Sequence, residues 1–194
     1  QWRGVYAVEG RNNARIGRSD FDAGHRFNLN VSYRKEYAGF MASTVSLFYN
    51  GQSGSPFSYT YDSDISNQDS RERALIFVPA TEGQIELVDN GSMTPAQQWA
   101  ALDAYIANDD YLKYRRGRYA EKNEARTPFE SVIDLKFMQD FYLELADGKR
   151  NTLQITFDIF NFGNLLNKDW GRRYNTPNGD GTSVELLNYQ GNVT

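Results

Sequence analysis

Hydrophobic and polar residues alternate strictly in four segments of the chain. In the first of these segments, Phe27, Leu29 and Val31 are separated by Asn28 and Asn30. A period of two places the apolar side chains of a β-strand on one face and the polar ones on the other. The alternation therefore predicts strands at about 26–34, 40–50, 131–145 and 152–162. Such strands exceed the roughly five or six residues usual in globular proteins and are long enough to cross a membrane at a tilt.

The connections between these segments are alternately short and long. Tight turns at 35–39 and 146–151 follow the first and third strands, whereas the segment at about 51–130 separates the second strand from the third. Outer-membrane barrels have brief periplasmic turns and large extracellular loops. The pattern predicts a mainly β protein with antiparallel β-strands of a large transmembrane β-barrel and a long extracellular loop that contains a short helix. Four strands cannot close a barrel, which needs at least about eight, so we expect a partial barrel.

The helix in the long loop has a clear start signal. Thr94 and Gln97 have the spacing of a capping box, and Pro95 stands at the first helical position. The expected helix runs to about residue 108 and buries three apolar residues, Trp99, Leu102 and Ile106. A second short helix at 109–116 and a short strand at 74–79 are also expected from the local pattern.

Composition agrees with the barrel interpretation and excludes several other classes. Aromatic residues make up 14% of the chain, yet its mean hydropathy is −0.67, as expected when apolar and polar residues alternate in membrane strands. The net charge of −4 provides no basic face for nucleic acid. The absence of Cys excludes disulfides and thiolate metal sites.

Candidate catalytic and metal-binding motifs are incomplete. His25 is the only histidine, and the segment 51–55 (GQSGS) lacks the final glycine of a nucleophile elbow. The segment 62–69 (DSDISNQD) resembles a calcium loop, but Asn67 replaces the required glycine and Arg73 stands where the bidentate Glu belongs. The segment 178–182 (NGDGT) is a turn signal. We therefore expect no enzyme activity and no cofactor, and a solvated loop rather than a calcium site.

One cluster of aromatic and basic residues is a candidate ligand site. Tyr111, Tyr114, Arg115 and Arg116 combine aromatic faces with guanidinium groups, which suit a sugar ring or an acidic peptide. The same residues also suit loop packing with a solvated basic edge, and the sequence favours this second interpretation.

An ordered set of motifs resembles the C-terminal barrel region of TonB-dependent outer-membrane receptors, most closely the Oar-like branch with a carboxypeptidase-regulatory-like domain. The segment 158–171 (DIFNFGNLLNKDWG) is similar to the penultimate-strand motif of that family. Further similar segments are 19–26 (SDFDAGHR), 54–58 (GSPFS), 102–112 (LDAYIANDDYL), 116–128 (RGRYAEKNEARTP) and 134–141 (DLKFMQDF). The chain departs from the family pattern at Lys122 and Glu124, where Arg and Gly are expected.

The resemblance implies a transporter in the cell outer membrane. Such a receptor binds a nutrient (a peptide, a glycan or a metal chelate) at the cell surface and imports it with energy from the inner membrane. Its partners would be the ligand, outer-membrane lipid and the TonB complex, the last through an N-terminal plug region that this chain does not contain. A final amphipathic strand is also missing, so we expect the chain to be a fragment of the receptor.

A different class remains open from the residues alone. A secreted or surface-bound β-rich module with Tyr and Trp platforms could bind glycans or peptides. Such a module would cover its apolar strand faces with its own residues, whereas a barrel segment would leave them facing lipid.

Overall fold

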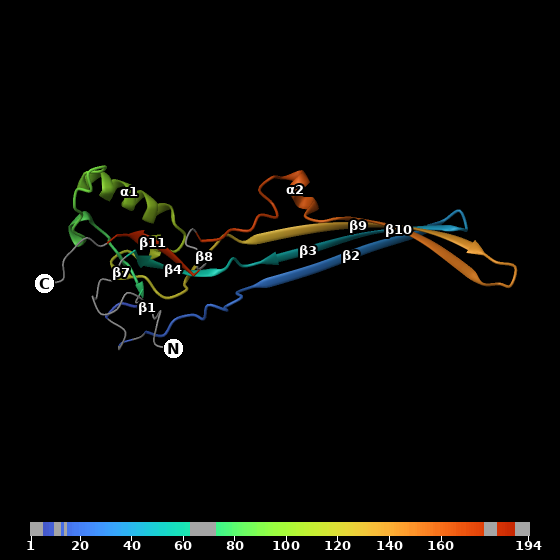
Figure 1. Cartoon of the computed structure of the whole chain (residues 1–194), viewed down its shortest axis with the longest axis horizontal. Coiled ribbons are helices and arrows are strands. Elements are labelled where there is room, and N and C mark those ends of the chain that lie inside the picture. Colours follow the sequence, from blue (N-terminus) through green and yellow to red (C-terminus); the bar gives the residue numbers. More distant parts are fainter. Residues whose placement is uncertain (1–5, 10–12, 14, 63–72, 177–181, 189–194) are drawn as a thin grey trace. The chain divides into compact units, whose positions relative to one another are not determined.

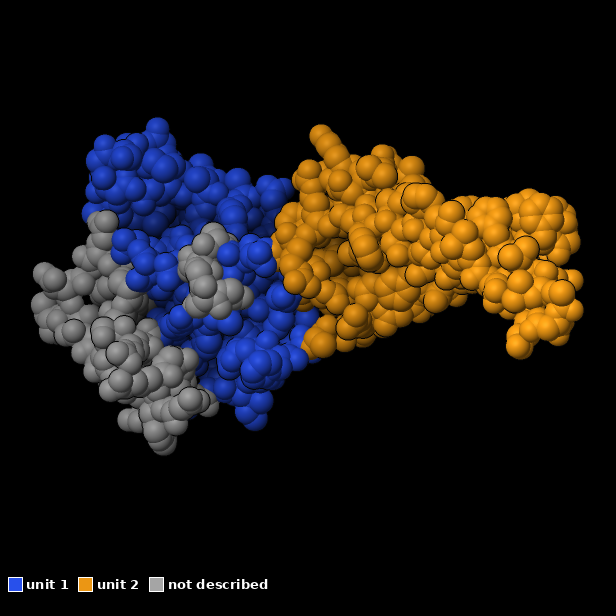
Figure 2. Space-filling model, turned by 45° about the vertical axis from the view of Figure 1, so that its right-hand side comes forward, with its two compact units in different colours: residues 1–22, 55–127, 175–194 blue, residues 23–54, 128–174 orange. Residues whose placement is uncertain are grey.

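The computed structural model describes residues 6–9, 13, 15–62, 73–176 and 182–188 of the chain. The protein is mainly β, with 43% of its residues in strands and 15% helical. The chain divides into two compact units (Figure 2), of which unit 1 comprises residues 1–22, 55–127 and 175–194 and unit 2 comprises residues 23–54 and 128–174. None of the described helices has the length and apolar character needed to span a membrane.

Four long strands form the sheet of unit 2 (Figure 1): β2 (Arg26–Tyr37), β3 (Met41–Gln52), β9 (Glu130–Glu144) and β10 (Arg150–Ile159). They are antiparallel in the order β10-β9-β3-β2, which confirms the four predicted strands. The turn after β2 is tighter than predicted, because β2 continues to Tyr37 and the positive φ angles of Ala38 and Gly39 (57° and 73°) reverse the chain at once. Within the described residues the sheet is open, with edges at β2 and β10, and forms no closed barrel.

The register places the predicted apolar residues on one face of this sheet. Directly opposed residues of antiparallel strands share a face. One such row across all four strands consists of Tyr33, Val45, Phe137 and Phe157, and the next consists of Val31, Leu47, Leu135 and Ile159. Asn30, Phe48 and Asp134 form a row of the opposite face. The predicted common face of Phe27, Leu29, Val31, Leu135, Phe137, Ile155 and Phe157 is therefore confirmed, as is the opposite face of Asn28, Asn30, Asp134, Gln154 and Thr156.

The last strand of unit 2 ends earlier than predicted. Asn161 adopts a left-handed φ of 54°, which interrupts the extended backbone, and the chain enters the short helix α2 (Phe162–Leu166). Gly171 closes this segment, because its N–H donates to the Ser131 carbonyl at 2.8 Å and its carbonyl accepts from Asn161 Nδ2 at 3.3 Å. The predicted strand at 152–162 therefore includes two residues of the turn, Phe160 and Asn161, and the first residue of α2, Phe162.

Unit 1 is built from short strands around one helix. Its three-stranded sheet has the order β11 (Ser183–Leu187), β4 (Pro56–Tyr61), β8 (Ala125–Arg126). Two-stranded pairs join β1 (Tyr6–Ala7) to β5 (Arg73–Ala74) and β6 (Phe77–Val78) to β7 (Arg118–Tyr119). The helical elements are η1 (Glu82–Gln84), α1 (Pro95–Asn108) and η2 (Leu112–Tyr114). The predicted strand at 74–79 is thus two shorter ones, and the predicted helix at 109–116 is only the 3₁₀ turn η2.

Helix α1 begins and ends where the sequence predicts. Thr94 N–H donates to Gln97 Oε1 at 2.9 Å, and Gln97 N–H donates to Thr94 Oγ1 at 3.4 Å, which completes the capping box. Leu102 and Ile106 are buried, as expected. The expected burial of Trp99 is wrong, because Trp99 only flanks the core and stays partly exposed. The centre of the core consists of Tyr59, Ile76, Val78, Ile106 and Leu112.

Candidate functional site

The apolar face of unit 2 is exposed over most of its length. Phe27, Tyr33 and Phe157 have 58%, 67% and 60% of their surface accessible, although each lies in a regular strand beside apolar neighbours. The other exposed apolar residues of this face include Leu29, Val31, Val45, Phe137, Leu153, Ile155 and Ile159. Contiguous apolar surface of this extent is rare on monomeric soluble proteins and marks a surface that contacts another protein, a membrane or a ligand.

The opposite face of the same sheet is polar and internally bonded. Arg34 Nη1 donates to Asp140 Oδ2 at 2.8 Å, and Gln154 Nε2 donates to Asp140 Oδ1 at 2.7 Å. The Asp140 side chain is only 5% exposed, because strands on both sides cover it. Lys136 pairs with Asp158 at 3.5 Å further along this face. One face of the sheet therefore exposes apolar side chains, whereas the other carries polar side chains that bond one another.

Unit 1 contains an aromatic cluster next to helix α1. The hydroxyl of Tyr59 donates to Asp109 Oδ2 at 2.5 Å, and the ring of Tyr59 stacks on Tyr111 with centroids 6.4 Å apart. Burial, together with the hydrogen bond to Asp109, raises the pKa of Tyr59 well above its usual value. Burial also raises the pKa of Tyr111. Asp109 is fixed in place as well, because its Oδ1 accepts from the backbone N–H groups of Tyr111 and Leu112.

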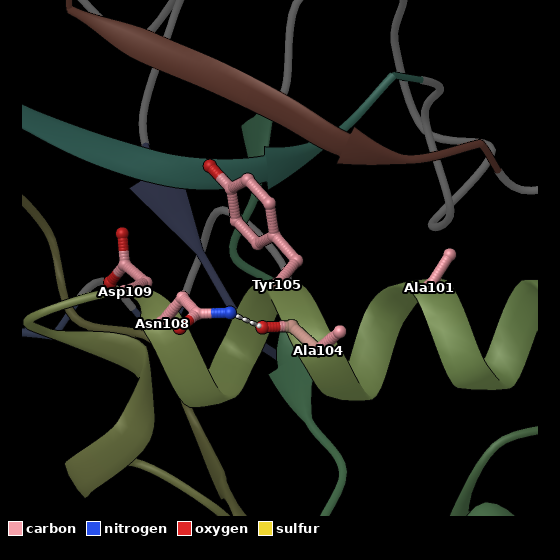
Figure 3. Close-up of a pocket in the computed structure, with 5 residues that line it drawn as sticks. All are labelled: Ala101, Ala104, Tyr105, Asn108 and Asp109. Carbon is pink, nitrogen blue, oxygen red and sulfur yellow. Dashed lines mark hydrogen bonds between the residues drawn. The ribbon is translucent and has the colours of Figure 1, made fainter.

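An open pocket lies beside this cluster, on the surface of α1 (Figure 3). Its volume is about 410 Å³, and its lining consists of Ala101, Ala104, Tyr105, Asn108 and Asp109. In Figure 3 the side chains of Ala101, Tyr105 and Asp109 point to the same side of the helix, and Asn108 Nδ2 donates to the Ala104 carbonyl at 2.8 Å. The two alanines leave room above the helix, while Tyr105 supplies an aromatic ring and Asp109 a fixed carboxylate. Such a lining suits a ligand with an apolar ring face and hydrogen-bond donors.

The four residues of the sequence-predicted site do not line this pocket. Tyr111 is half-buried under Tyr59, and its hydroxyl accepts from the Glu121 N–H at 2.7 Å. Arg115 donates to Glu121 Oε1 at 2.9 Å and to the Tyr119 carbonyl at 2.8 Å.

Arg116 and Tyr114, the other two residues of the sequence-predicted site, differ in their surroundings. Arg116 Nη2 lies 2.7 Å from Asp103 Oδ1 and also donates to the Asp103 carbonyl. Tyr114 is 78% exposed, with the Lys113 ammonium over its ring at 5.3 Å. Of the four residues, three therefore hold the loops of unit 1 together, and only Tyr114 is open to solvent.

Part of the pocket lining is visible as a pattern in the sequence of α1. Ala101, Tyr105 and Asn108 follow one another at helical spacing on α1, on a stripe of the helix next to the one that carries the buried Leu102 and Ile106. Small residues at such positions leave a helix surface uncovered. Only the fold shows that the remaining wall is the carboxylate of Asp109, which the Tyr59 hydroxyl holds in place.

No further chemical site is found among the described residues. In that part of the chain no group of three or more His, Asp or Glu side chains is arranged to hold a metal ion. The calcium-like segment at 62–69 and the turn signal at 178–182 lie almost wholly outside the described residues. Comparison of the chain with protein-family models, with curated proteins and with solved structures gives no significant match.

Proposed function

We propose that unit 2 forms four neighbouring strands of a transmembrane β-barrel in the cell outer membrane. The observation that carries this proposal is the exposed apolar face of the sheet, which continues in register across all four strands while the opposite face is polar. Hydrocarbon would cover the apolar face, and the polar face would line the lumen. Each strand has 10 to 15 residues, against the roughly 9–11 needed for one tilted crossing.

The edges of the sheet support the same proposal. In lipid, unpaired backbone groups cost several kcal/mol each, roughly, so an open sheet edge is not stable there. Strands β2 and β10 each have one edge without a partner among the described residues. In the proposed barrel both edges pair with further strands of the same protein.

We further propose that the whole protein is a transporter of the TonB-dependent receptor type, as the motif resemblance implies. It binds a nutrient at the cell surface, interacts with the TonB complex through its plug region, and imports the ligand without covalent chemistry. The segments of unit 1 precede β2, connect β3 to β9 and follow β10. By connectivity these are the long loops, which lie on the extracellular side in such barrels.

The pocket on α1 is the proposed ligand contact of unit 1. Tyr105 is 42% exposed and provides a ring face, and the neighbouring Asp109 carboxylate accepts hydrogen bonds. Ligands of this chemistry include glycans and peptides. Tyr114 remains a proposed ligand contact. Tyr111, Arg115 and Arg116 are proposed instead to hold the loops of unit 1 in position.

A cysteine scan along β2 tests the barrel proposal, because the chain contains no Cys of its own. Single Cys residues at Phe27, Leu29, Val31 and Tyr33 are compared with Cys at Asn28, Asn30 and Ser32 in the full protein in its membrane. A lipid-soluble quencher should reach a label at the first set only, and a water-soluble quencher should reach the second set. Accessibility of both sets to the water-soluble quencher would instead support a secreted glycan- or peptide-binding module.

The pocket is tested separately by ligand uptake. Tyr105→Ala removes the aromatic wall of the pocket. Tyr119→Ala is the matched control, because Tyr119 is a tyrosine of unit 1 with similar exposure (40%, against 42% for Tyr105) that does not line the pocket. We expect a loss of ligand affinity of roughly fivefold for Tyr105→Ala, since an aromatic contact contributes about 1 kcal/mol. Unchanged binding and uptake in Tyr105→Ala would remove the pocket from the proposal and leave the barrel untouched.

A further inference from the structure

Helix α2 and the turn after it carry a second exposed apolar surface. Phe160, Leu165, Leu166 and Trp170 are between 44% and 79% exposed, although they lie within a folded segment of unit 2. We call these four residues the α2 patch. Exposed leucine and aromatic side chains at this density mark a contact surface.

The α2 patch is held rigidly against the sheet. A Cβ at Gly163 would lie 3.4 Å from the Trp170 ring and 3.5 Å from Ile133, so helix, tryptophan and strand β9 are in close contact there. Ile133 is opposed to Tyr49 of β3, which places it in the apolar face of the sheet. Gly163 and Trp170 therefore pack beside the apolar face at Ile133, and Leu165 and Leu166 belong to the same short helix as Gly163.

Basic residues accompany the α2 patch. The segment from Lys168 to Arg173 contains three cations and a single acid, Asp169. Arg172 Nε donates to the Lys168 carbonyl at 2.8 Å and Arg172 Nη1 lies 3.3 Å from Asp169, which fixes the guanidinium beside the backbone of the turn. The Lys168 ammonium is exposed and has no ion pair among the described residues. Apolar side chains and cations thus occur side by side on one short segment.

The α2 patch lies at the end of strand β10, ten residues beyond the short turn at 146–149. Strand β10 runs ten residues from the short turn at 146–149 to Ile159, and α2 follows immediately. About ten residues is one membrane crossing of a tilted strand. In the proposed barrel α2 therefore lies at the membrane–water boundary, on the side of the long connections. At such a boundary, aromatic residues and basic side chains meet acyl chains and anionic headgroups.

We propose that the α2 patch and its cations bind a phosphorylated lipid of the outer leaflet. Acyl chains pack on Phe160, Leu165 and Leu166, and the phosphate lies between Lys168 and Arg172. The inference rests on the proposed barrel and goes further, because it assigns a lipid class to one defined segment. The position of α2 at the proposed membrane–water boundary favours a lipid over a protein partner.

The test places a fluorescent label at Leu166→Cys in the full protein and reconstitutes it in vesicles with nitroxide-labelled acyl chains. The probes are phosphatidic acid and phosphatidylcholine at equal mole fraction. A cation beside the lipid surface contributes about a fivefold preference for anionic lipid. We therefore expect phosphatidic acid to be at least about fivefold more effective as quencher at position 166. Lys168→Gln with Arg172→Gln should abolish the preference, and the control Lys35→Gln with Lys149→Gln, which removes two cations near the short turns, should keep it.

A second label at Val31→Cys separates this inference from the barrel proposal. Val31 lies in the middle of the apolar face, and both lipids should quench its label equally. If the Val31 label is not quenched by either lipid, the barrel proposal is wrong. If it is quenched while the Leu166 label is not, the patch binds something other than lipid and the inference is overturned. Equal quenching of the Leu166 label by both lipids, or a preference that survives the Lys168 and Arg172 changes, also overturns it.

Discussion

Leu112 of unit 1 and Leu153 of unit 2 are the same residue type in opposite surroundings. Leu112 is fully buried among Tyr59, Ile106 and other core residues, whereas Leu153 is 65% exposed on a face of similarly exposed residues. Unit 1 thus follows the usual rule of a protein in water, with apolar side chains inside. Unit 2 has no such interior, because a single sheet layer cannot cover its own apolar face. The difference shows that the two units dispose of their apolar side chains in different ways: unit 1 encloses them, and unit 2 leaves them on an open face.

Removal of a core side chain from unit 1 should have the largest effect. Leu112→Ala leaves a cavity, so we expect a loss of about 2–5 kcal/mol in the stability of unit 1. Leu153→Ala is the matched control. It should lose only the free energy of removing apolar surface from water, roughly 0.8 kcal/mol per methylene, because a side chain on an open face leaves no cavity. Hydrogen exchange of the amides in each unit measures both losses. Equal losses at the two positions would contradict the comparison.

A charge on the apolar face of unit 2 should be nearly as harmful. In a barrel, Val31→Arg places a cation in hydrocarbon and should cost about 2–4 kcal/mol near the midplane. Asn30→Arg is one residue away, faces the polar side, and should cost much less. Folding into vesicles, followed by urea titration, measures both changes. Similar costs for Val31→Arg and Asn30→Arg would mean that lipid does not distinguish the two faces.

The closure of the α2 segment should be sensitive to one methyl group. Gly171 has a φ of 67°, and a Cβ there would lie 1.7 Å from Asn161 Oδ1. We expect Gly171→Ala to cost roughly 1–3 kcal/mol from backbone strain, with a further cost from the displaced Asn161. The control is Gly148→Ala, where φ is 77° but no atom lies within 4 Å of the added carbon. The difference between the two variants in thermal or urea unfolding isolates the collision, and equal effects would show that Asn161 moves aside freely.

The smallest expected effect concerns the buried tyrosines of unit 1. Burial raises the pKa of Tyr59 above the unfolded value of about 10, and the pKa values of Tyr61 and Tyr111 are raised by burial as well. The unfolded chain therefore loses these protons first, so the stabilisation is complete below about pH 10 and declines as the pH rises above it. Tyr59→Phe should make the alkaline decline shallower, and near neutral pH it should cost only about 1 kcal/mol for the lost hydrogen bond to Asp109. Unfolding followed by circular dichroism over a series of pH values measures the cost near neutral pH and the loss of stability above about pH 10. If stability falls with rising pH as steeply in Tyr59→Phe as in the unchanged protein, Tyr59 is accessible to water.

The strands of unit 2 were predictable because their signal is local and regular. Alternation with a period of two assigns each side chain to a face whatever the strand pairs with, so the faces of β2, β9 and β10 were correct. Helix α1 was equally predictable, since its capping box and Pro95 act within one turn. The end of β10 was predicted too late, because the apolar residues after it continue the pattern while Asn161 changes the backbone.

The candidate site was less accessible to sequence reasoning. Tyr111, Arg115 and Arg116 have the composition of a ligand site, and their partners Tyr59, Glu121 and Asp103 could be identified only in the folded unit. Likewise, nothing in the residues around Ala101 and Ala104 shows that Asp109 completes a pocket beside them.

The sequence alone therefore determined the elements whose cause lies within a few residues: the two-faced strands, their tight turns and the capped helix. Tertiary structure alone decided which short strands of unit 1 pair, such as β4 with β11 more than 120 residues away, and which tyrosines and arginines are buried or open. The physical reason is that burial and pairing depend on distant segments that meet only in the folded chain. The grouping of the apolar residues of unit 2 on one face belongs to the first group, because a period of two assigns faces regardless of the rest of the fold. The exposure of that face belongs to the second, because it depends on which other segments cover the sheet.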